Sequence, residues 1–239
     1  MQGPSASYRF YPLGDNAITI DFGNCIDENI NRAVIARFRQ LTQAPLPCML
    51  EAVPAYSSLT VYFDIVAARK KSGPLTSLDW MKSQLENVMQ EPADSTEPAV
   101  PVRHLPVCYD KEFAPDLQRV AIAKKLSVDE VIQLHTSSVY RVYMLGFLPG
   151  FAYLGATDER IAVPRKPQPV NIIPGSVGLA GRQTGIYPLA SPGGWQIIGR
   201  TPVKLLDVTA PEPVLLKTGD RVQFYPISKT EFEKNMQAL

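Results

Sequence analysis

Glycine and proline are concentrated in one part of the chain, and this concentration limits the possible folds more than any other feature. Residues 141–200 hold 10 of the 15 glycines and 7 of the 22 prolines in the sequence. Proline has no N–H for a helix interior, and glycine favours turns, so long helices are disfavoured there. Apolar residues in this window follow no helical period. The pattern predicts short strands joined by turns, as in a β-barrel or sandwich.

Composition excludes several classes of protein. Hydrophobic residues make up 45% of the chain and charged residues 20%, with a net charge of +1. Collagen, disordered chains and coiled coils have different compositions, and near-neutral charge gives no support for nucleic-acid binding. No stretch approaches the roughly 18 apolar residues of a membrane span, and the N-terminus lacks a signal-peptide core. We therefore expect a cytoplasmic protein that binds neither nucleic acid nor membrane.

The N-terminal part, residues 1–92, is predicted to be a small α+β domain. Apolar residues recur at helical spacing in two stretches, 27–43 and 76–90, with Asp27 and Thr76 as their N-caps. Three β-rich runs lie at 17–22, 49–53 and 58–63. The expected order ββαββα indicates a small sheet with helices packed on one face.

A linker is expected next, because residues 91–101 contain three prolines and three acidic residues but no large apolar residue before Val100. We place the domain boundary near residue 95. The second domain, residues 98–239, should be a β-barrel with helical segments at 115–125 and 128–135, the latter with a Ser127 cap.

Two further elements are expected in the second domain. A strand should cover residues 139–147, and a hairpin should cover 214–227 around a turn at 217–220. The polar tail from Ser228 should end in a short helix.

Four segments combine glycine and proline with aromatic and polar side chains: 146–155, 164–167, 174–188 and 191–202. Rigid turns, flat aromatic walls and a few hydrogen-bond donors together form a typical ligand cleft. Alternatively, the glycines and prolines only turn the corners of a barrel. The window 141–200 has six basic and two acidic residues, so an anionic ligand is favoured.

For several single residues in this region, the sequence allows more than one role. His135 either interacts with the dipole at a helix C-terminus or approaches the cleft. Arg165 is either a solvated loop charge or part of an anion clamp. For Ser176 a hydroxyl that caps a turn is favoured over a nucleophile, because no His lies near it in the sequence; the GxSxG motif is also absent. Cys25, Cys48 and Cys108 lack ligand spacing, so no metal site is expected.

The motifs GFLPGFAYLG, SPGGWQIIGRTP and GDRVQFYPI, together with the N-terminal LGDNAITIDFG, resemble one known family. This is the KipI family, often labelled allophanate hydrolase subunit 1, which includes the B subunit of bacterial ATP-dependent 5-oxoprolinase. The resemblance covers residues 8–227. It implies an N-terminal α/β domain followed by a cyclophilin-like β-barrel.

The resemblance also implies an activity and partners. The chain would be one subunit of an enzyme that cleaves 5-oxo-L-proline to L-glutamate with ATP hydrolysis, inactive alone. Its partners would be a C subunit of the KipA type and an A subunit of the LamB/YcsF type, with the ATP site shared with or supplied by a partner. Related domains form the carboxyltransferase part of urea carboxylase. The alternative is a KipI-type inhibitor that binds a sensor histidine kinase.

The resemblance and the residue pattern together predict a site. We expect Arg165, Gln183 and Arg200 to be catalytic and to line one concave face of the barrel, with His135 at its edge. A bend at 184–186 should turn Gln183 and Tyr187 toward the same cleft. The predicted substrate-binding residues are Phe147, Phe151, Tyr153, Ser176, Tyr187 and Trp195. One departure weakens this transfer: the second Arg that the family places after Pro169 is replaced by Val170.

Overall fold

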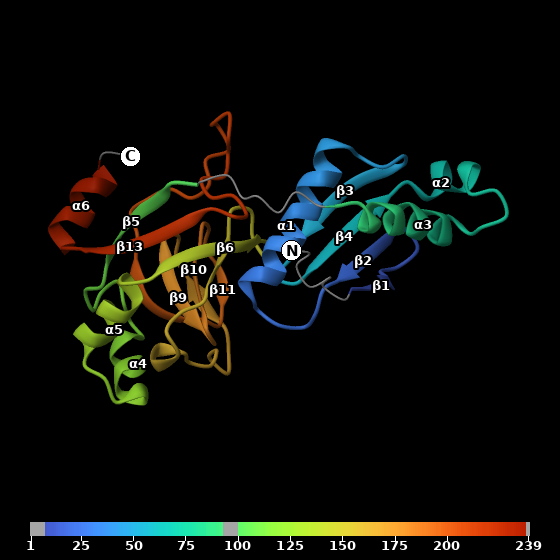
Figure 1. Cartoon of the computed structure of the whole chain (residues 1–239). Coiled ribbons are helices and arrows are strands. Elements are labelled where there is room, and N and C mark those ends of the chain that lie inside the picture. Colours follow the sequence, from blue (N-terminus) through green and yellow to red (C-terminus); the bar gives the residue numbers. More distant parts are fainter. Residues whose placement is uncertain (1–7, 93–99, 238–239) are drawn as a thin grey trace. The chain divides into compact units, whose positions relative to one another are not determined.

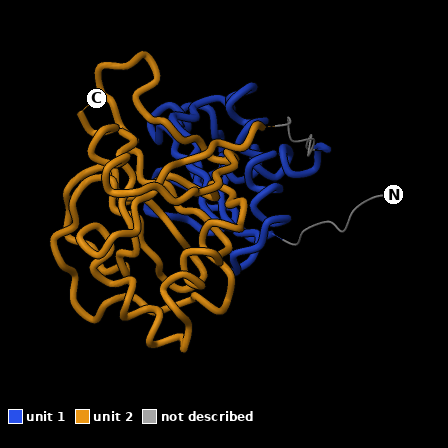
Figure 2. Tube along the Cα trace, turned by 90° about the vertical axis from the view of Figure 1, so that its left-hand side faces the viewer, with its two compact units in different colours: residues 1–98 blue, residues 99–239 orange. Residues whose placement is uncertain are grey.

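The computed structural model describes residues 8–92 and 100–237. The chain forms two compact units, residues 1–98 and 99–239 (Figure 2). The expected boundary near residue 95, and most of the expected linker, lie outside the described residues. Each unit has its own hydrophobic core.

The first unit is an antiparallel sheet of four strands in the order β1-β2-β4-β3 (Figure 1). Its strands are β1 Arg9–Pro12, β2 Ala17–Asp21, β3 Met49–Pro54 and β4 Ser58–Phe63. On β4, Leu59, Val61 and Phe63 are fully buried, whereas the residues between them are half-buried. This alternation places one face of the sheet against the core, as the sequence pattern predicted.

Three helices belong to this unit: α1 Glu28–Gln43, α2 Ile65–Lys71 and α3 Ser77–Gln90. The Asp27 carboxylate accepts hydrogen bonds from two backbone N–H groups of α1 and caps it, and the Thr76 hydroxyl caps α3. Both predicted caps are therefore confirmed. The sequence analysis missed α2, because its seven residues bury only Ala68 and show no apolar period.

The second unit contains a closed barrel whose strands follow the order β10-β7-β6-β13-β5-β12-β9 (Figure 1). The strands are β5 Val102–Cys108, β6 Val139–Leu145, β7 Ala152–Gly155, β9 Ser176–Ala180, β10 Gln183–Ile186, β12 Gln196–Arg200 and β13 Arg221–Ile227. A separate two-stranded sheet pairs β8 Val170–Ile172 with β11 Ser191–Gly193. The predicted fold class, an α+β unit followed by a β-barrel, is confirmed.

Helices of the second unit are α4 Leu117–Lys124, α5 Val128–Thr136 and α6 Lys229–Gln237, with the short 3₁₀ helix η1 Glu159–Ile161. A reciprocal capping box joins Ser127 and Glu130 at the start of α5, as predicted. The C-terminal α6 buries Phe232, which packs against the Phe113 ring. The predicted helical segments are all present.

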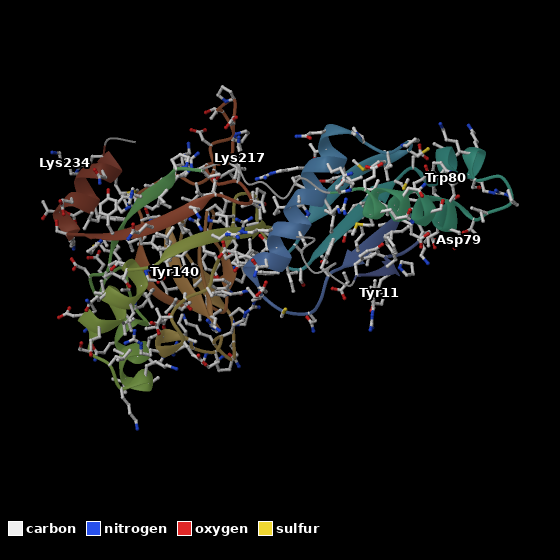
Figure 3. All side chains as sticks on the ribbon, viewed as in Figure 1. Tyr11, Asp79, Trp80, Tyr140, Lys217 and Lys234 are labelled. Carbon is white, nitrogen blue, oxygen red and sulfur yellow. The ribbon has the colours of Figure 1, made fainter. Side chains whose placement is uncertain are left out.

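The predicted hairpin over 214–227 is wrong. Its turn exists, since Asp220 N–H donates to the Lys217 carbonyl, but the segment before the turn does not pair with β13. β13 instead lies parallel to β5 on one side and antiparallel to β6 on the other. Both edges of β13 are thus occupied, and Val214 forms a bridge with Leu206. Lys217 lies on the long loop between β12 and β13 (Figure 3).

None of the helices in residues 8–92 and 100–237 is both long and apolar enough to cross a membrane.

Candidate functional site

Two glycines leave a bare patch of backbone on the outer face of the barrel. Gly178 of β9 and Gly185 of β10 are direct partners in the ladder. Val177 and Leu179 belong to the barrel core, so Gly178 between them faces outward. A Cβ atom built on Gly185 would lie 3.1 Å from both the Phe151 and the Trp195 ring. The glycines therefore make room for two aromatic rings on the barrel surface.

Replacing Gly185 by alanine should disturb this face more than the barrel core. The new Cβ would lie 2.9 Å from the Ala152 carbonyl oxygen and would push against Phe151 and Trp195. Overpacking of this kind costs about 1–3 kcal/mol in the free energy of unfolding. Urea unfolding followed by Trp195 fluorescence would measure the loss. A variant as stable as the parent would show that the rings are loosely held.

The aromatic rings above these glycines form a small pocket of about 220 Å³. Phe151 meets four rings of this pocket edge to face, with centroid distances of 4.7–5.6 Å. The lining residues are Phe147, Phe151, Tyr153, Arg165, Pro169, Tyr187, Pro192, Gly193, Gly194 and Trp195. We call this the aromatic pocket. Five of the six predicted substrate-binding residues line it, and Ser176 does not.

Among the described residues that line the aromatic pocket, Arg165 is the only charged one. Its guanidinium carbon lies 6.0 Å from the centre of the Trp195 ring. It makes no hydrogen bond or ion pair within residues 8–92 and 100–237, so its five donors are free for a ligand. Burial raises the pKa of Tyr153 and of Tyr187, and Arg165 opposes this rise in both. Both phenols are therefore neutral at pH 7.

Lys166, next to Arg165, points the other way and anchors the loop. Its ammonium lies 2.6 Å from the Asp116 carboxylate, and both side chains are only 11% exposed. Its backbone N–H donates to the Gly194 carbonyl. Asp116 in turn accepts a 2.7 Å hydrogen bond from the Ile197 N–H at the start of β12. Lys166 thereby holds Arg165 beside Trp195.

Two more side chains reinforce this anchor. Arg119 donates to Asp116 and to the Gln196 side-chain oxygen, and the Gln196 amide donates to the Pro164 carbonyl. The sequence analysis missed Asp116, because its partners are 50 and 81 residues away along the chain. No local motif marks it. We call the group of Asp116, Arg119, Lys166 and Gln196 the anchor cluster.

Arg200 does not share the aromatic pocket with Arg165, so the prediction that the two arginines line one face is wrong. Arg200 ends β12 and lines a separate cavity of about 210 Å³. Five residues of strand separate it from Trp195, which corresponds to about 16 Å at about 3.3 Å per residue. Because β12 is extended, Arg200 at its end lies far from Trp195 just before its start. The glycine content of the segment does not show this separation.

Gln183 and Ser176 also lie away from the aromatic pocket. Gln183 starts β10 and pairs with Gly155 and Ala180. The predicted bend over 184–186 is absent, because these residues form regular strand. Four strand residues therefore separate Gln183 from Tyr187 by about 13 Å. Ser176 is buried at the start of β9.

His135 lies inside the barrel unit rather than at the edge of a cleft. Its ring is fully buried and stacks on Phe224 at a centroid distance of 4.7 Å. The Thr184 hydroxyl donates to the Gly178 carbonyl, so it accepts from His135 Nε2, and Nδ1 accepts from the Tyr109 hydroxyl. Burial lowers the pKa of His135 to about 3. A neutral ring with both nitrogens bonded is structural and unsuited to acid–base catalysis.

The comparisons with known proteins identify the family. Residues 8–216 match the family model described as "Carboxyltransferase domain, subdomain C and D". The B subunit of 5-oxoprolinase from Bacillus subtilis is 43% identical over 94% of this chain and 95% of the relative. The chain belongs to the family of 5-oxoprolinase B subunits. The resemblance stated from sequence motifs is thereby confirmed.

Further relatives agree with this family. The B subunit of 5-oxoprolinase from Escherichia coli O157:H7 is 36% identical over 91% of this chain and 95% of the relative. The urea amidolyase structure from K. lactis superposes with a TM-score of 0.76 at 19% identity, over 99% of this chain and 16% of that chain. At that identity the likeness concerns the fold alone.

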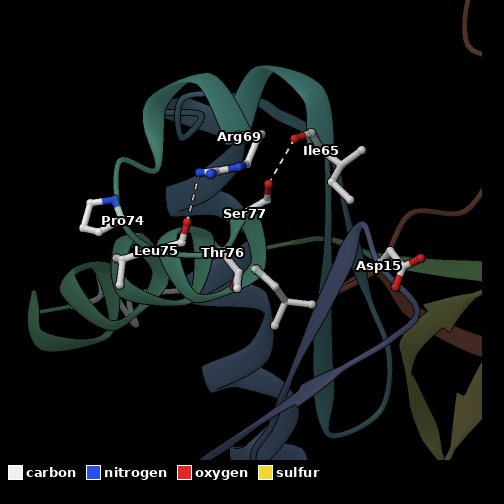
Figure 4. Close-up of a pocket in the computed structure, with 8 residues that line it drawn as sticks. Asp15, Ile65, Arg69, Pro74, Leu75, Thr76 and Ser77 are labelled. Carbon is white, nitrogen blue, oxygen red and sulfur yellow. Dashed lines mark hydrogen bonds between the residues drawn. The ribbon is translucent and has the colours of Figure 1, made fainter.

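The first unit of this family member carries a larger pocket, of about 420 Å³, beside α2 and α3 (Figure 4). Arg69 points across it but donates to the carbonyls of Gly73 and Leu75 and to the Ser72 hydroxyl. The Ser77 hydroxyl donates to the Ile65 carbonyl. These hydrogen bonds stabilise the turn between the helices. Among the described residues, no group of three His, Cys, Asp or Glu could hold a metal ion.

Proposed function

We propose that this chain is one subunit of an ATP-dependent 5-oxoprolinase, which cleaves 5-oxo-L-proline to L-glutamate together with partner subunits. The observation that carries the proposal is the 43% identity, over nearly the full length of both chains, to the B subunit of a 5-oxoprolinase. The partners would be the C and A subunits. The chain itself would supply a binding surface rather than a complete active site.

The aromatic pocket supports this proposal by its size and chemistry. Its volume of about 220 Å³ suits a five-membered ring with one carboxylate. Aromatic edges and faces pack against the ring, and the unpaired Arg165 guanidinium would bind the carboxylate in a bidentate manner. The absence of any acidic residue from the lining leaves that carboxylate unopposed.

The chemistry explains why ATP and partners are needed. A lactam carbonyl is a weak electrophile at neutral pH. Transfer of the γ-phosphoryl group from ATP to the lactam oxygen releases ADP and makes a good leaving group. Water then attacks the ring carbon, and the C–N bond opens as the nitrogen takes a proton, which leaves an acyl phosphate. A second water hydrolyses this acyl phosphate to glutamate and phosphate. These reaction steps need groups that stabilise the negative charge of the phosphoryl group. We recognise no nucleotide-binding loop in this chain, so a partner subunit would supply those groups or share them.

Reconstitution tests the proposed function. The chain should show no ATP-coupled turnover alone, and should form glutamate and ADP in equal amounts when mixed with the A and C subunits. Coupled assays of both products, with each subunit omitted in turn, would measure this. Full turnover by the isolated chain would contradict a site shared between subunits. If the A and C subunits were fully active without this chain, the assignment as a subunit would be wrong.

Arg165→Gln in the reconstituted complex should raise KM for 5-oxoproline more than it lowers kcat. Losing a charge-assisted bond to a carboxylate costs about 1.5–3 kcal/mol, or roughly 10- to 150-fold in kcat/KM. Arg182→Gln is the matched control, because Arg182 is an exposed arginine of the same unit outside the aromatic pocket. Initial rates over a range of 5-oxoproline concentrations give both constants. Equal kinetics for the two variants would remove Arg165 from the site.

The alternative, inhibition of a sensor histidine kinase, stays a prediction. A proline-containing segment would also suit aromatic walls, but it would not need the free guanidinium of Arg165.

A further inference from the structure

The cavity that Arg200 lines is separate from the aromatic pocket and lies where β12 ends. Its volume is about 210 Å³. Residues from four parts of the chain line it, including Pro174, Gly175, Pro188, Arg200, Lys204 and Met236. Of the described residues that line it, two are basic and none is acidic. We call it the Arg200 cavity.

Arg200 is held in a fixed orientation there. Its Nε donates a 2.9 Å hydrogen bond to the Pro174 carbonyl, and its guanidinium carbon lies 5.5 Å from the centre of the Phe232 ring on α6. With Nε occupied and one face over an aromatic ring, the two terminal nitrogens remain as donors. Neither makes a hydrogen bond or ion pair to any part of the chain that the structure describes. A guanidinium oriented in this way is prepared for a planar or tetrahedral oxyanion.

Among the residues that the structure describes, no carboxylate pairs with the Arg200 guanidinium. Burial lowers the pKa of Arg200, and no carboxylate among the described residues opposes that effect. A half-buried cation without a partner is costly, and binding of an anion would remove the cost. Lys204 adds a second positive charge to the same cavity, although it also pairs with Asp207 at 3.1 Å.

The floor of the cavity is rigid. Gly175 adopts φ +83°, a conformation that favours glycine. Its N–H donates to the Tyr187 carbonyl and its carbonyl accepts from the Thr201 N–H. The Pro174 carbonyl that holds Arg200 is therefore fixed by the adjoining residue. The donors keep their positions whether or not a ligand is present.

We propose that the Arg200 cavity is a second oxyanion-binding site, which takes the carboxylate or phosphate group of a small ligand through the terminal nitrogens of Arg200. This inference goes beyond the proposed function, because the Arg200 cavity and the aromatic pocket have no lining residue in common. The site therefore binds a different anion from the one that Arg165 would hold.

The test follows the Arg200 Nε–H signal in ¹⁵N-labelled full-length protein during titration with inorganic phosphate and, separately, with acetate. The signal is identified by its loss in Arg200→Lys. We expect a saturable shift with one of the two anions, in the millimolar range. The anion that binds more tightly distinguishes a phosphate site from a carboxylate site, and either result supports the proposal.

Two variants locate the binding, followed by calorimetry with the same anion. Affinity should fall about 10-fold or more in Arg200→Gln, as expected when a charge-assisted pair is lost. In Arg165→Gln the Arg200 Nε–H signal should shift over the same anion concentrations as in the parent. Should Arg200→Gln fail to fold, Lys204→Gln should still weaken binding measurably. No saturable shift with either anion, or equal affinity in parent and Arg200 variant, would overturn the proposal. An effect of Arg165→Gln on 5-oxoproline KM is independent of this outcome, so the two proposals fail separately.

Discussion

Asp116→Ala should destabilise the barrel unit by about 3–5 kcal/mol, the cost of breaking a buried ion pair by removing one partner. The substitution leaves the Lys166 ammonium buried without its carboxylate and the Ile197 N–H without its acceptor. Urea unfolding in a Trp80→Phe background measures the change. Trp80 lies on α3 in the first unit (Figure 3), so Trp195 then reports the barrel unit alone.

Two controls test why the Asp116 variant loses stability: one removes an exposed ion pair, and the other removes both charges of the buried pair. Glu212→Ala removes one side of the exposed pair between Glu212 and Lys217, in which both side chains are at least 60% exposed, and should leave the unfolding midpoint unchanged. Lys166→Met combined with Asp116→Ala should cost less than the sum of the single changes, because neither charge is then left alone. Additive losses, or an Asp116 variant as stable as the parent, would contradict a coupled anchor cluster.

The anchor cluster should also affect the proposed site, through the position of Arg165. Lys166→Met in the reconstituted complex should raise KM for 5-oxoproline while leaving Arg165 itself intact. This rise depends on the proposed function, whereas the stability loss does not.

Stability of the barrel unit should fall as the pH drops below 6.5, and His135→Gln should remove most of that fall. The His135 pKa is about 3 in the folded protein, against an ordinary value of 6.5. The unfolded chain therefore binds one more proton than the folded chain between these two pH values. Its contribution is fully present above pH 6.5 and is lost toward pH 3, by about 1.4 kcal/mol per pH unit and about 4–5 kcal/mol in total.

Urea midpoints of the Trp80→Phe protein between pH 7.5 and 4.5 would measure this slope, with His135→Gln compared at each pH. Glutamine keeps a donor and an acceptor but does not titrate in this range. Carboxylates titrate equally in both proteins, so the difference between them isolates His135. Parallel curves would show that the ring is not held neutral by burial.

The sequence predicted local structure correctly where residues close together in the chain determine it. The caps at Asp27, Thr76 and Ser127 were predicted correctly, because an N-cap side chain bonds backbone N–H groups only two or three residues away. The class of the second unit was also readable, because glycine and proline exclude long helices over 141–200. The aromatic walls of the pocket were also predicted, because the aromatic residues lie within the same glycine- and proline-rich segments.

The assembly of the site was decided by tertiary structure. Whether Arg165 and Arg200 meet depends on strand register and on the length of β12, which pairs with β9 from the distant segment 176–180. The anchor cluster joins residues 50 and 77 positions apart, and the environment of His135 depends on which strand faces it. The sequence by itself determined most of the elements, the caps of three helices and the aromatic composition of the site, but neither α2 nor the pairing of β13. Only the closed barrel decided which side chains face inward, which face outward and which share a pocket, because strand pairing is non-local and each one-residue step along a strand reverses the face.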